Sequence, residues 1–301
     1  MFVKNILKEI LVKASPYFRN LFFYESLVIK NCRIAKRKNS FFSKFINFVF
    51  SNEYFSRSLA QRTEIQGKLM GGIAGRDWAS YYGDANNEYP PQKGSKLGNL
   101  DWYDACPSFN RVLKIMDDDS YNICFIQLGA SSGKEIFYFA KRYPKADFIY
   151  TDIYESVTNY AATNISLPNL KFVTCPAESL PALAEICNKK RVIIFSSGSS
   201  QYVFPENLDY TFSLFSKIKN KQIEFIFDEP GNNLISKNIS FRGSSPRGNF
   251  SYTHNYKYYA EKNNFQTYKW EIIKLYEPQS EFYPEHQGTI RLSGWFSFYS
   301  C

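Results

Sequence analysis

The stretch FIQLGASSGKE, residues 125–135, joins an apolar run to a loop of small residues and then to a helical pattern. A strand, a glycine-bounded loop and a helix in this order are typical of nucleotide-binding sites. A phosphate-binding P-loop has four residues between its glycines and a hydroxyl residue after its lysine. Here only three residues separate Gly129 from Gly133, and Glu135 follows Lys134. A dinucleotide loop is also disfavoured, because the second glycine of GxGxxG is missing.

From about residue 111 onward, short apolar runs alternate with helical patterns, as expected for a parallel sheet with crossover helices. The predicted strands are residues 122–128, 147–152, 170–175, 191–196, 223–228, 265–276 and 289–299. The predicted helices are residues 133–144, 154–165, 178–189, 206–219 and 254–264. The stretch 229–253 is too long for a simple connection, and we interpret it as a lid or substrate loop.

Five strand–helix units, a further helix and a terminal strand pair resemble the class I, Rossmann-like S-adenosylmethionine-dependent methyltransferases over residues 111–301. The family pattern, an acidic residue and then GxGxG, falls on Gln127, Gly129, Ser131 and Gly133. Gln127 replaces the acid and Ser131 replaces the middle glycine. The resemblance implies an α/β fold with a seven-stranded, mostly parallel sheet, helices on both faces and an antiparallel last strand. It also implies an enzyme that uses S-adenosylmethionine as its cofactor.

Asp152 ends the second predicted strand, nineteen positions after Gly133, where vicinal ribose hydroxyls need an acceptor. Alternatively, TDIYES starts a helix that Asp152 caps. By resemblance, the cofactor site also includes Ala130, Ile153, Ser197 at the end of the fourth strand, and Ala177 and Glu178 in CPAESLP (175–181). For Glu178 the alternative is an acidic residue that stabilises a helix N-terminus.

The segment SSGSSQY (196–202) follows the fourth strand, at the position that faces the methyl group in the resembling family. It lacks the Asn/Asp-Pro-Pro-aromatic motif of methyltransferases that act on nucleobase amines, which argues against such a substrate. An oxygen acceptor must also lose a proton, so the reaction needs a base. The candidate bases, predicted near the C-terminal strand ends, are His254, His286, Asp228 and Glu229. The candidate substrate-binding residues are Tyr202, Arg242 and Arg247.

Each of these residues also has a structural interpretation. The histidines could cap helices, the two acids could accept hydrogen bonds from the following turn, and the arginines could be solvated loop charges. The six cysteines form no CxxC pair and the chain has two histidines, so no metal site is expected.

The formal charge of +9 is concentrated near the N-terminus. Residues 1–60 hold eleven Lys/Arg and three Glu, a balance of +8, which leaves +1 for the rest of the chain. We therefore divide the chain into a basic helical extension (1–70), an aromatic-rich loop or cap segment (71–110) and the S-adenosylmethionine-binding domain (111–301). Residues 1–50 combine basic clusters with an apolar helical stripe, which suits an anionic membrane, a partner or the chain's own domain.

The sequence thus predicts a cytoplasmic methyltransferase, with peripheral contact to the inner face of the membrane through its basic segment. The predicted acceptor is a hydroxyl of a sugar or of a glycan or glycolipid precursor. Two alternatives remain open: an RNA methyltransferase whose basic arm contacts phosphates, with nucleic acid the less favoured partner, and a non-catalytic module that keeps the fold.

Overall fold

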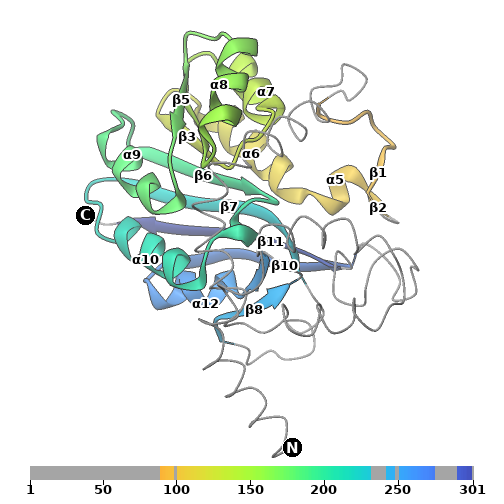
Figure 1. The fold of residues 1–301 in the computed structure, drawn as a ribbon, viewed down its shortest axis with the longest axis vertical. Coiled ribbons are helices and arrows are strands. Elements are labelled where there is room, and N and C mark those ends of the chain that lie inside the picture. The colour runs from red at the N-terminus through yellow and green to blue at the C-terminus, as the bar shows by residue number, and fades with distance from the viewer. Residues whose placement is uncertain (1–88, 98–99, 232–241, 248–250, 275–289, 300–301) are drawn as a thin grey trace, which may run out of the picture.

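The computed structural model describes residues 89–97, 100–231, 242–247, 251–274 and 290–299. The predicted N-terminal extension and the first part of the predicted cap segment lie outside the described residues, as does His286. The described chain is built around one seven-stranded sheet that is covered by helices on both sides (Figure 1).

The central sheet has the strand order β10–β11–β7–β6–β3–β4–β5. Its strands are β3 (Ile123–Leu128), β4 (Asp147–Asp152), β5 (Leu170–Thr174), β6 (Arg191–Ser197), β7 (Gln222–Gly231), β10 (Gln266–Lys274) and β11 (Ile290–Tyr299). The first five pair in parallel, whereas β11 runs antiparallel to its two neighbours, β7 and β10. The predicted sheet with its antiparallel last strand is confirmed, and each predicted strand limit lies within three residues of the observed one.

The middle strand, β3, decides where a ligand can bind. All six of its residues are buried, because β6 and β4 flank it and helices cover both faces. The chain builds β4 and β5 on one side of β3 and then crosses to build β6 and β7 on the other side. At such a reversal the loops that leave the two neighbouring strands diverge, and the crevice between them is where ligands bind in open α/β sheets.

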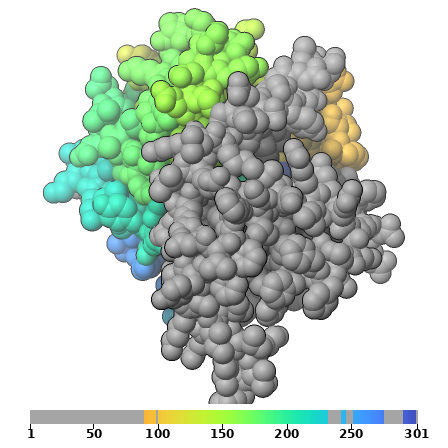
Figure 2. Space-filling model, in the orientation of Figure 1, coloured from red at the N-terminus to blue at the C-terminus, as the bar shows by residue number. Residues whose placement is uncertain are grey.

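The helices divide between the two faces of the sheet, as the resemblance implied. The helices α6 (Pro107–Asp119), α7 (Lys134–Arg142) and α8 (Glu155–Asn164) pack on one face; α9 (Leu180–Ile186), α10 (Pro205–Phe215) and α12 (Tyr256–Lys262) pack on the other. In the space-filling view the surfaces of α8, α9 and α10 run along one side of the molecule, from green to cyan (Figure 2).

The helix α6 was not among the helices that the sequence predicted. It begins at Pro107, inside the predicted cap segment, and buries Phe109, Val112 and Met116 in the same core as β3. Its sequence PSFNRVLKIMDDD contains apolar residues at helical spacing, but the preceding Gly- and Pro-rich stretch obscured its start. The helix therefore crosses the boundary that the sequence placed between residues 110 and 111.

The long connection after β7 also differs from the irregular stretch that the sequence predicted. The strands β8 (Ser244–Arg247) and β9 (Ser251–His254) pair as a small antiparallel sheet. His254 ends β9 instead of starting a helix, and α12 begins two residues later behind Asn255, whose side chain caps it.

Before α6, the described chain forms only short elements. The strands β1 (Lys96–Leu97) and β2 (Leu100–Asp101) pair with each other, and α5 (Trp102–Ala105) follows directly. Across the described ranges, every helix falls short of the length and apolar character that a membrane span requires.

Candidate functional site

In the loop between β3 and α7, every second residue from Gly129 to Gly133 has a left-handed backbone conformation. Gly129, Ser131 and Gly133 have φ angles of +62°, +49° and +74°. These are the three positions on which the family's GxGxG pattern falls, so Ser131 has the backbone of the glycine it replaces. A side chain in this conformation costs roughly 1–2 kcal/mol. The hydroxyl of Tyr150 donates a hydrogen bond of 2.5 Å to the Ser131 carbonyl and helps to hold it there.

Asp152 connects this loop to the end of β4. The side chain is 7% exposed. Its Oδ2 accepts a hydrogen bond of 3.2 Å from the Ser131 backbone N–H, and its Oδ1 accepts one of 3.0 Å from the Tyr154 N–H. Burial raises the pKa of Asp152, and these N–H donors act in the opposite direction. The bond to Tyr154 is a local turn contact and not the helix cap considered above, because Tyr154 is the N-cap residue of α8 and no side chain caps that helix. The bond to Ser131 places the carboxylate against the loop.

The segment after β5 lies at the same end of the sheet. Ala177 is buried and begins a 3₁₀ turn, η1 (Ala177–Ser179). The Glu178 carboxylate accepts a hydrogen bond from the Asn207 side chain of α10. Glu178 thus ties this turn to the neighbouring helix. Ile153, next to Asp152, is 48% exposed and offers an apolar surface beside the carboxylate.

The segment after β6 is held by Glu229, a predicted base. Ser197 ends β6, and the 3₁₀ turn η2 (Ser200–Tyr202) follows it. Glu229 is fully buried, and its Oε1 accepts hydrogen bonds from the Ser196 hydroxyl at 2.6 Å and from the Ser199 and Ser200 N–H groups at 3.0 Å. These contacts make Glu229 the anchor of the turn. The Ser199 hydroxyl in turn donates to the Gly129 carbonyl at 2.8 Å, which joins this turn to the β3 loop.

Asp228, another predicted base, performs a similar anchoring task for α6. Its Oδ2 accepts a hydrogen bond of 3.1 Å from the Ser108 N–H, and its Oδ1 accepts one of 3.0 Å from the Ser108 hydroxyl. Cys106, the N-cap residue of α6, makes no side-chain cap bond, so Asp228 satisfies a first-turn N–H from across the sheet. Asp228 is 1% exposed, and burial raises its pKa.

His254 is enclosed between the small sheet and α12. The ring is fully buried, and its Nδ1 lies 2.6 Å from the Ser244 hydroxyl. The rings of Tyr252, Tyr256 and Tyr259 pack around it, with centroid distances of 5.6, 5.3 and 6.2 Å. Burial lowers the pKa of His254 to about 3, so the imidazole is neutral at pH 7. Besides β8, β9 and α12, the ring faces the backbone of Ser200 and Val203 at the η2 turn. Ser199 joins that turn to the β3 loop.

The predicted substrate-binding residues come from two segments, the η2 turn and the chain at the start and end of β8. Tyr202, at the end of η2, is 51% exposed, and Arg242 is exposed just before β8. Arg247 ends β8. Of these three, Tyr202 is the one whose element is fixed to the β3 loop through Ser199 and Glu229.

Sequence reasoning missed a polar cluster beside the loop. Glu135, in the first turn of α7, accepts a hydrogen bond of 2.6 Å from Gln127 Nε2 and another from the hydroxyl of Tyr89. Burial raises the pKa of Glu135 to about 7. Arg291, near the start of β11, is brought to this end of the sheet because β11 is antiparallel. The sequence signal was present only as an unexplained acid in GKE, two positions after Gly133.

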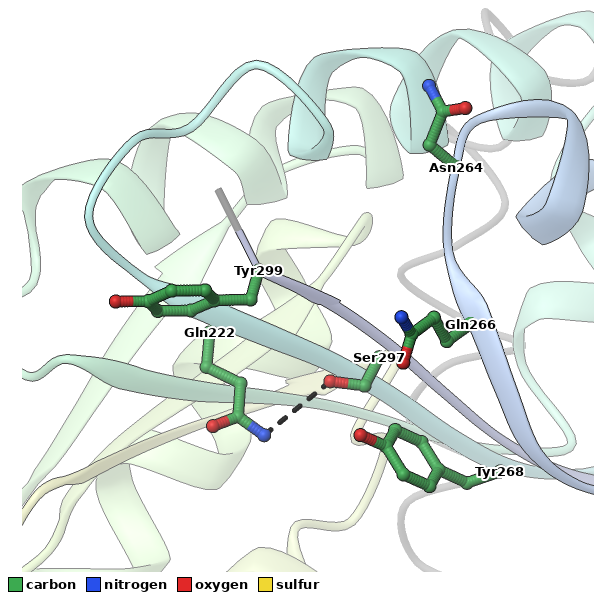
Figure 3. Close-up of a pocket in the computed structure, with 6 residues that line it drawn as sticks. All are labelled: Gln222, Asn264, Gln266, Tyr268, Ser297 and Tyr299. Atoms are coloured by element: carbon green, nitrogen blue, oxygen red, sulfur yellow. Dashed lines mark hydrogen bonds between the residues drawn. The ribbon is translucent and has the colours of Figure 1, made fainter. Parts of the chain in front are cut away.

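A separate cavity lies at the other end of the strands. It has a volume of about 210 Å³ and is lined by Gln222, Asn264, Gln266, Tyr268, Ser297 and Tyr299. Figure 3 shows the amide of Gln222 directed at the Ser297 hydroxyl, 3.5 Å away. Because Gln222 begins β7 and Tyr299 ends the antiparallel β11, this cavity is remote from the β3 loop. Among the described residues, no group of three or more His, Cys, Asp or Glu side chains could hold a metal ion.

Comparisons with known proteins found similar solved structures at low sequence identity. No family model and no curated protein sequence matches the chain. Similar solved structures include an S-adenosylmethionine-dependent methyltransferase from Aquifex aeolicus, at 12% identity and a TM-score of 0.43 over 67% of this chain and 90% of that one. They also include magnesium protoporphyrin IX methyltransferase from Synechocystis with bound S-adenosylhomocysteine, at 14% identity and a TM-score of 0.47 over 76% and 97%. The fold assignment, that of the Rossmann-like class I methyltransferases, rests on the strand order and directions described above.

Proposed function

We propose that this chain is an S-adenosylmethionine-dependent methyltransferase that methylates a hydroxyl group of a sugar-containing acceptor. The observation that carries the proposal is the contact between two loops at the reversal point of the sheet. There the left-handed β3 loop lies against the Asp152 carboxylate, through Ser131 N–H and Asp152 Oδ2 at 3.2 Å. A loop of glycines and small side chains, beside a buried carboxylate, suits a nucleoside with vicinal hydroxyls.

The residues of this site would bind and orient the ligand. The Asp152 carboxylate accepts backbone hydrogen bonds from Ser131, Ile153 and Tyr154, and with about four acceptor positions it keeps capacity for a ribose hydroxyl. Ala177 and Ile153 would supply apolar surface to the adenine. When bound, S-adenosylmethionine would supply a methyl group on a sulfonium sulfur, and this methyl group can be transferred to a correctly aligned nucleophile as the carbon–sulfur bond breaks and the neutral thioether leaves.

The acceptor part of the proposal depends on the segment after β6. Residues 196–202, SSGSSQY, are small or hydroxyl-bearing and lack the Pro-Pro-aromatic pattern that accompanies nucleobase amines. A sugar hydroxyl is therefore our preferred acceptor, with Tyr202 as a contact. Proton removal would fall to His254 or His286. For His254 this role requires the η2 turn to move, because the ring is buried beneath it.

Methyl transfer can be measured directly with S-adenosylmethionine labelled on its methyl group. The purified chain would be incubated with nucleotide sugars, lipid-linked sugars and RNA as separate acceptors. We expect label in a sugar-containing acceptor, and a roughly 10- to 100-fold lower transfer efficiency with Asp152→Ala, because a charged hydrogen-bond acceptor is lost. Glu185→Gln, an exposed carboxylate on α9, is the matched control and should leave transfer unchanged.

The outcomes separate the two parts of the proposal. Label in RNA alone would contradict the sugar acceptor and keep methyl transfer. No label in any acceptor, with S-adenosylmethionine binding demonstrated, would contradict the proposed activity.

A further inference from the structure

The two flanks of the β3 loop meet through their side chains. Gln127 lies two residues before Gly129, and Glu135 lies two residues after Gly133. Gln127 Nε2 donates to Glu135 Oε2 at 2.6 Å, and the Tyr89 hydroxyl donates to Glu135 Oε1. A carboxylate offers about four acceptor positions, so both oxygens of Glu135 keep free acceptor capacity.

The carbonyl oxygen of the Gln127 side chain, Oε1, has no hydrogen-bond partner among the described residues. Gln127 is 3% exposed. A buried acceptor without a donor costs about 1–3 kcal/mol. Such an atom, next to the loop that is proposed to hold a ligand, is explained by a donor that arrives with the ligand.

The charges around Glu135 also favour a donor. Asp228 on β7 and the Cys106 thiol before α6 face it, as do Tyr89 and the Arg291 guanidinium on β11. Burial raises the pKa of Cys106 to about 12, so this thiol stays neutral. Arg291 interacts with the carboxyl groups of Glu135, Asp228 and Glu229 together, and Arg111 adds a second positive charge near Asp228. With these acids ionised, the surroundings of Gln127 Oε1 carry excess negative charge.

The structure assigns Glu135 and Gln127 to the ammonium end of S-adenosylmethionine, with Glu135 as the counter-charge and Gln127 Oε1 as an uncharged acceptor. This inference rests on the proposed function. Gln127 already belongs to the cofactor site that the sequence predicts, whereas Glu135 had no role there; Glu135 supplies the negative charge that Gln127 lacks. An ammonium is a compact cation with three N–H donors and no acceptor, which matches one carboxylate and one unpartnered carbonyl oxygen. A carboxylate at this place would instead be repelled by Glu135 and Asp228.

Binding measurements on three nucleosides isolate this contact. S-adenosylmethionine and S-adenosylhomocysteine carry the ammonium, whereas 5′-methylthioadenosine lacks the whole amino-acid end. We expect Glu135→Gln to lower the affinity for S-adenosylmethionine and S-adenosylhomocysteine by about 10- to 100-fold. The affinity for 5′-methylthioadenosine should stay unchanged. Glu185→Gln removes an equal charge from exposed α9 and should change none of the three.

A charge-relocating double variant tests the same contact without a net change of charge. Gln127→Glu combined with Glu135→Gln moves the carboxylate from α7 to β3 and should recover most of the affinity that Glu135→Gln loses. Recovery supports the assignment. Affinity as low as in the single variant, in a folded protein that still binds 5′-methylthioadenosine, overturns it.

The unmodified chain gives a third readout. Because burial raises the pKa of Glu135 to about 7, protonation of this carboxylate competes with binding of the ammonium below that pH. Affinity for S-adenosylhomocysteine should therefore rise between pH 6 and pH 7.5, as Glu135 loses its proton. Affinity that is flat over this interval, or equal losses for all three nucleosides in Glu135→Gln, would overturn the assignment while leaving the proposed function intact. If no nucleoside binds the unmodified chain, the proposed function itself fails.

Discussion

Replacing Gly129 by alanine tests how the two ligand-site loops are held together. A Cβ at this position would lie 2.6 Å from the Cβ of Ser199 and 2.7 Å from its Oγ. The φ of +62° adds roughly 1–2 kcal/mol for a side chain in the left-handed region. Forced displacement of a packed neighbour adds about 1–3 kcal/mol. We therefore expect Gly129→Ala to lower the free energy of unfolding by about 2–5 kcal/mol.

Two further variants separate these contributions. Gly94 has a φ of +92° and nothing within 4 Å of an added Cβ, so Gly94→Ala should show the backbone contribution alone. Ser199→Gly removes the atoms that an alanine at position 129 would meet. Ser199→Gly also removes the hydrogen bond from the Ser199 hydroxyl to the Gly129 carbonyl, so the double variant is compared with Ser199→Gly alone. In that comparison the steric part of the loss, roughly 1–3 kcal/mol, should disappear and the backbone part should remain.

Urea unfolding followed by circular dichroism measures the unmodified chain and all four variants, with the slope of the transition checked for constancy. The reasoning is refuted if Gly129→Ala loses no more stability than Gly94→Ala. It is also refuted if Ser199→Gly fails to rescue Gly129→Ala.

Three other predictions concern single residues. Ser131→Gly should raise the free energy of unfolding by up to about 1 kcal/mol, because glycine adopts the left-handed backbone freely; a decrease would contradict the assigned loop geometry. Below about pH 6.5 the His254 side chain binds a proton in the unfolded chain but not in the folded one, where burial lowers its pKa to about 3. Stability should therefore fall as pH falls from about 6.5 toward 3, and His254→Gln should flatten that slope in acid unfolding curves. Hydrogen bonding from Cys124 lowers the pKa of Cys187, whereas burial raises the pKa of Cys106. Iodoacetamide at pH 7 should therefore label Cys187 faster than Cys106, and equal labelling of these two residues by mass spectrometry would count against this.

The parallel strands could be predicted because a strand buried on both faces is a continuous apolar run. The limits of β4, Asp147–Asp152, coincide with the predicted ones. The strand β7 runs three residues beyond its predicted end because β11 pairs with it as far as Gly231. Such pairing depends on a strand sixty residues further along the chain, so local sequence cannot indicate it.

The ligand loop was predictable for a related reason. Its conformation depends on small residues within one short stretch, and Asp152 lies at a fixed distance along one strand–helix unit. The left-handed backbone of Ser131 accounts for a serine at a glycine position. The pattern alone could not indicate whether serine would adopt that backbone.

The partners of the buried acids could not be predicted, because they come from distant parts of the chain. Asp228 binds Ser108, which is 120 residues away, and Glu135 binds Tyr89 across 46 residues. Glu229 holds a turn that ends near Gln201, 28 residues earlier. In sequence these acids resemble free carboxylates at strand or helix ends. The described structure places Asp228 and Glu229 among backbone donors, where they fix the segments that border the site.

Calorimetric titration with S-adenosylhomocysteine tests the central claim most directly, that the β3 loop and Asp152 form a nucleoside site. The account predicts binding at one site per chain, weakened by about 10- to 100-fold in Asp152→Ala and unchanged in Glu185→Gln. Folded protein that gives no binding signal, or Asp152→Ala that binds as tightly as the unmodified chain, would contradict it.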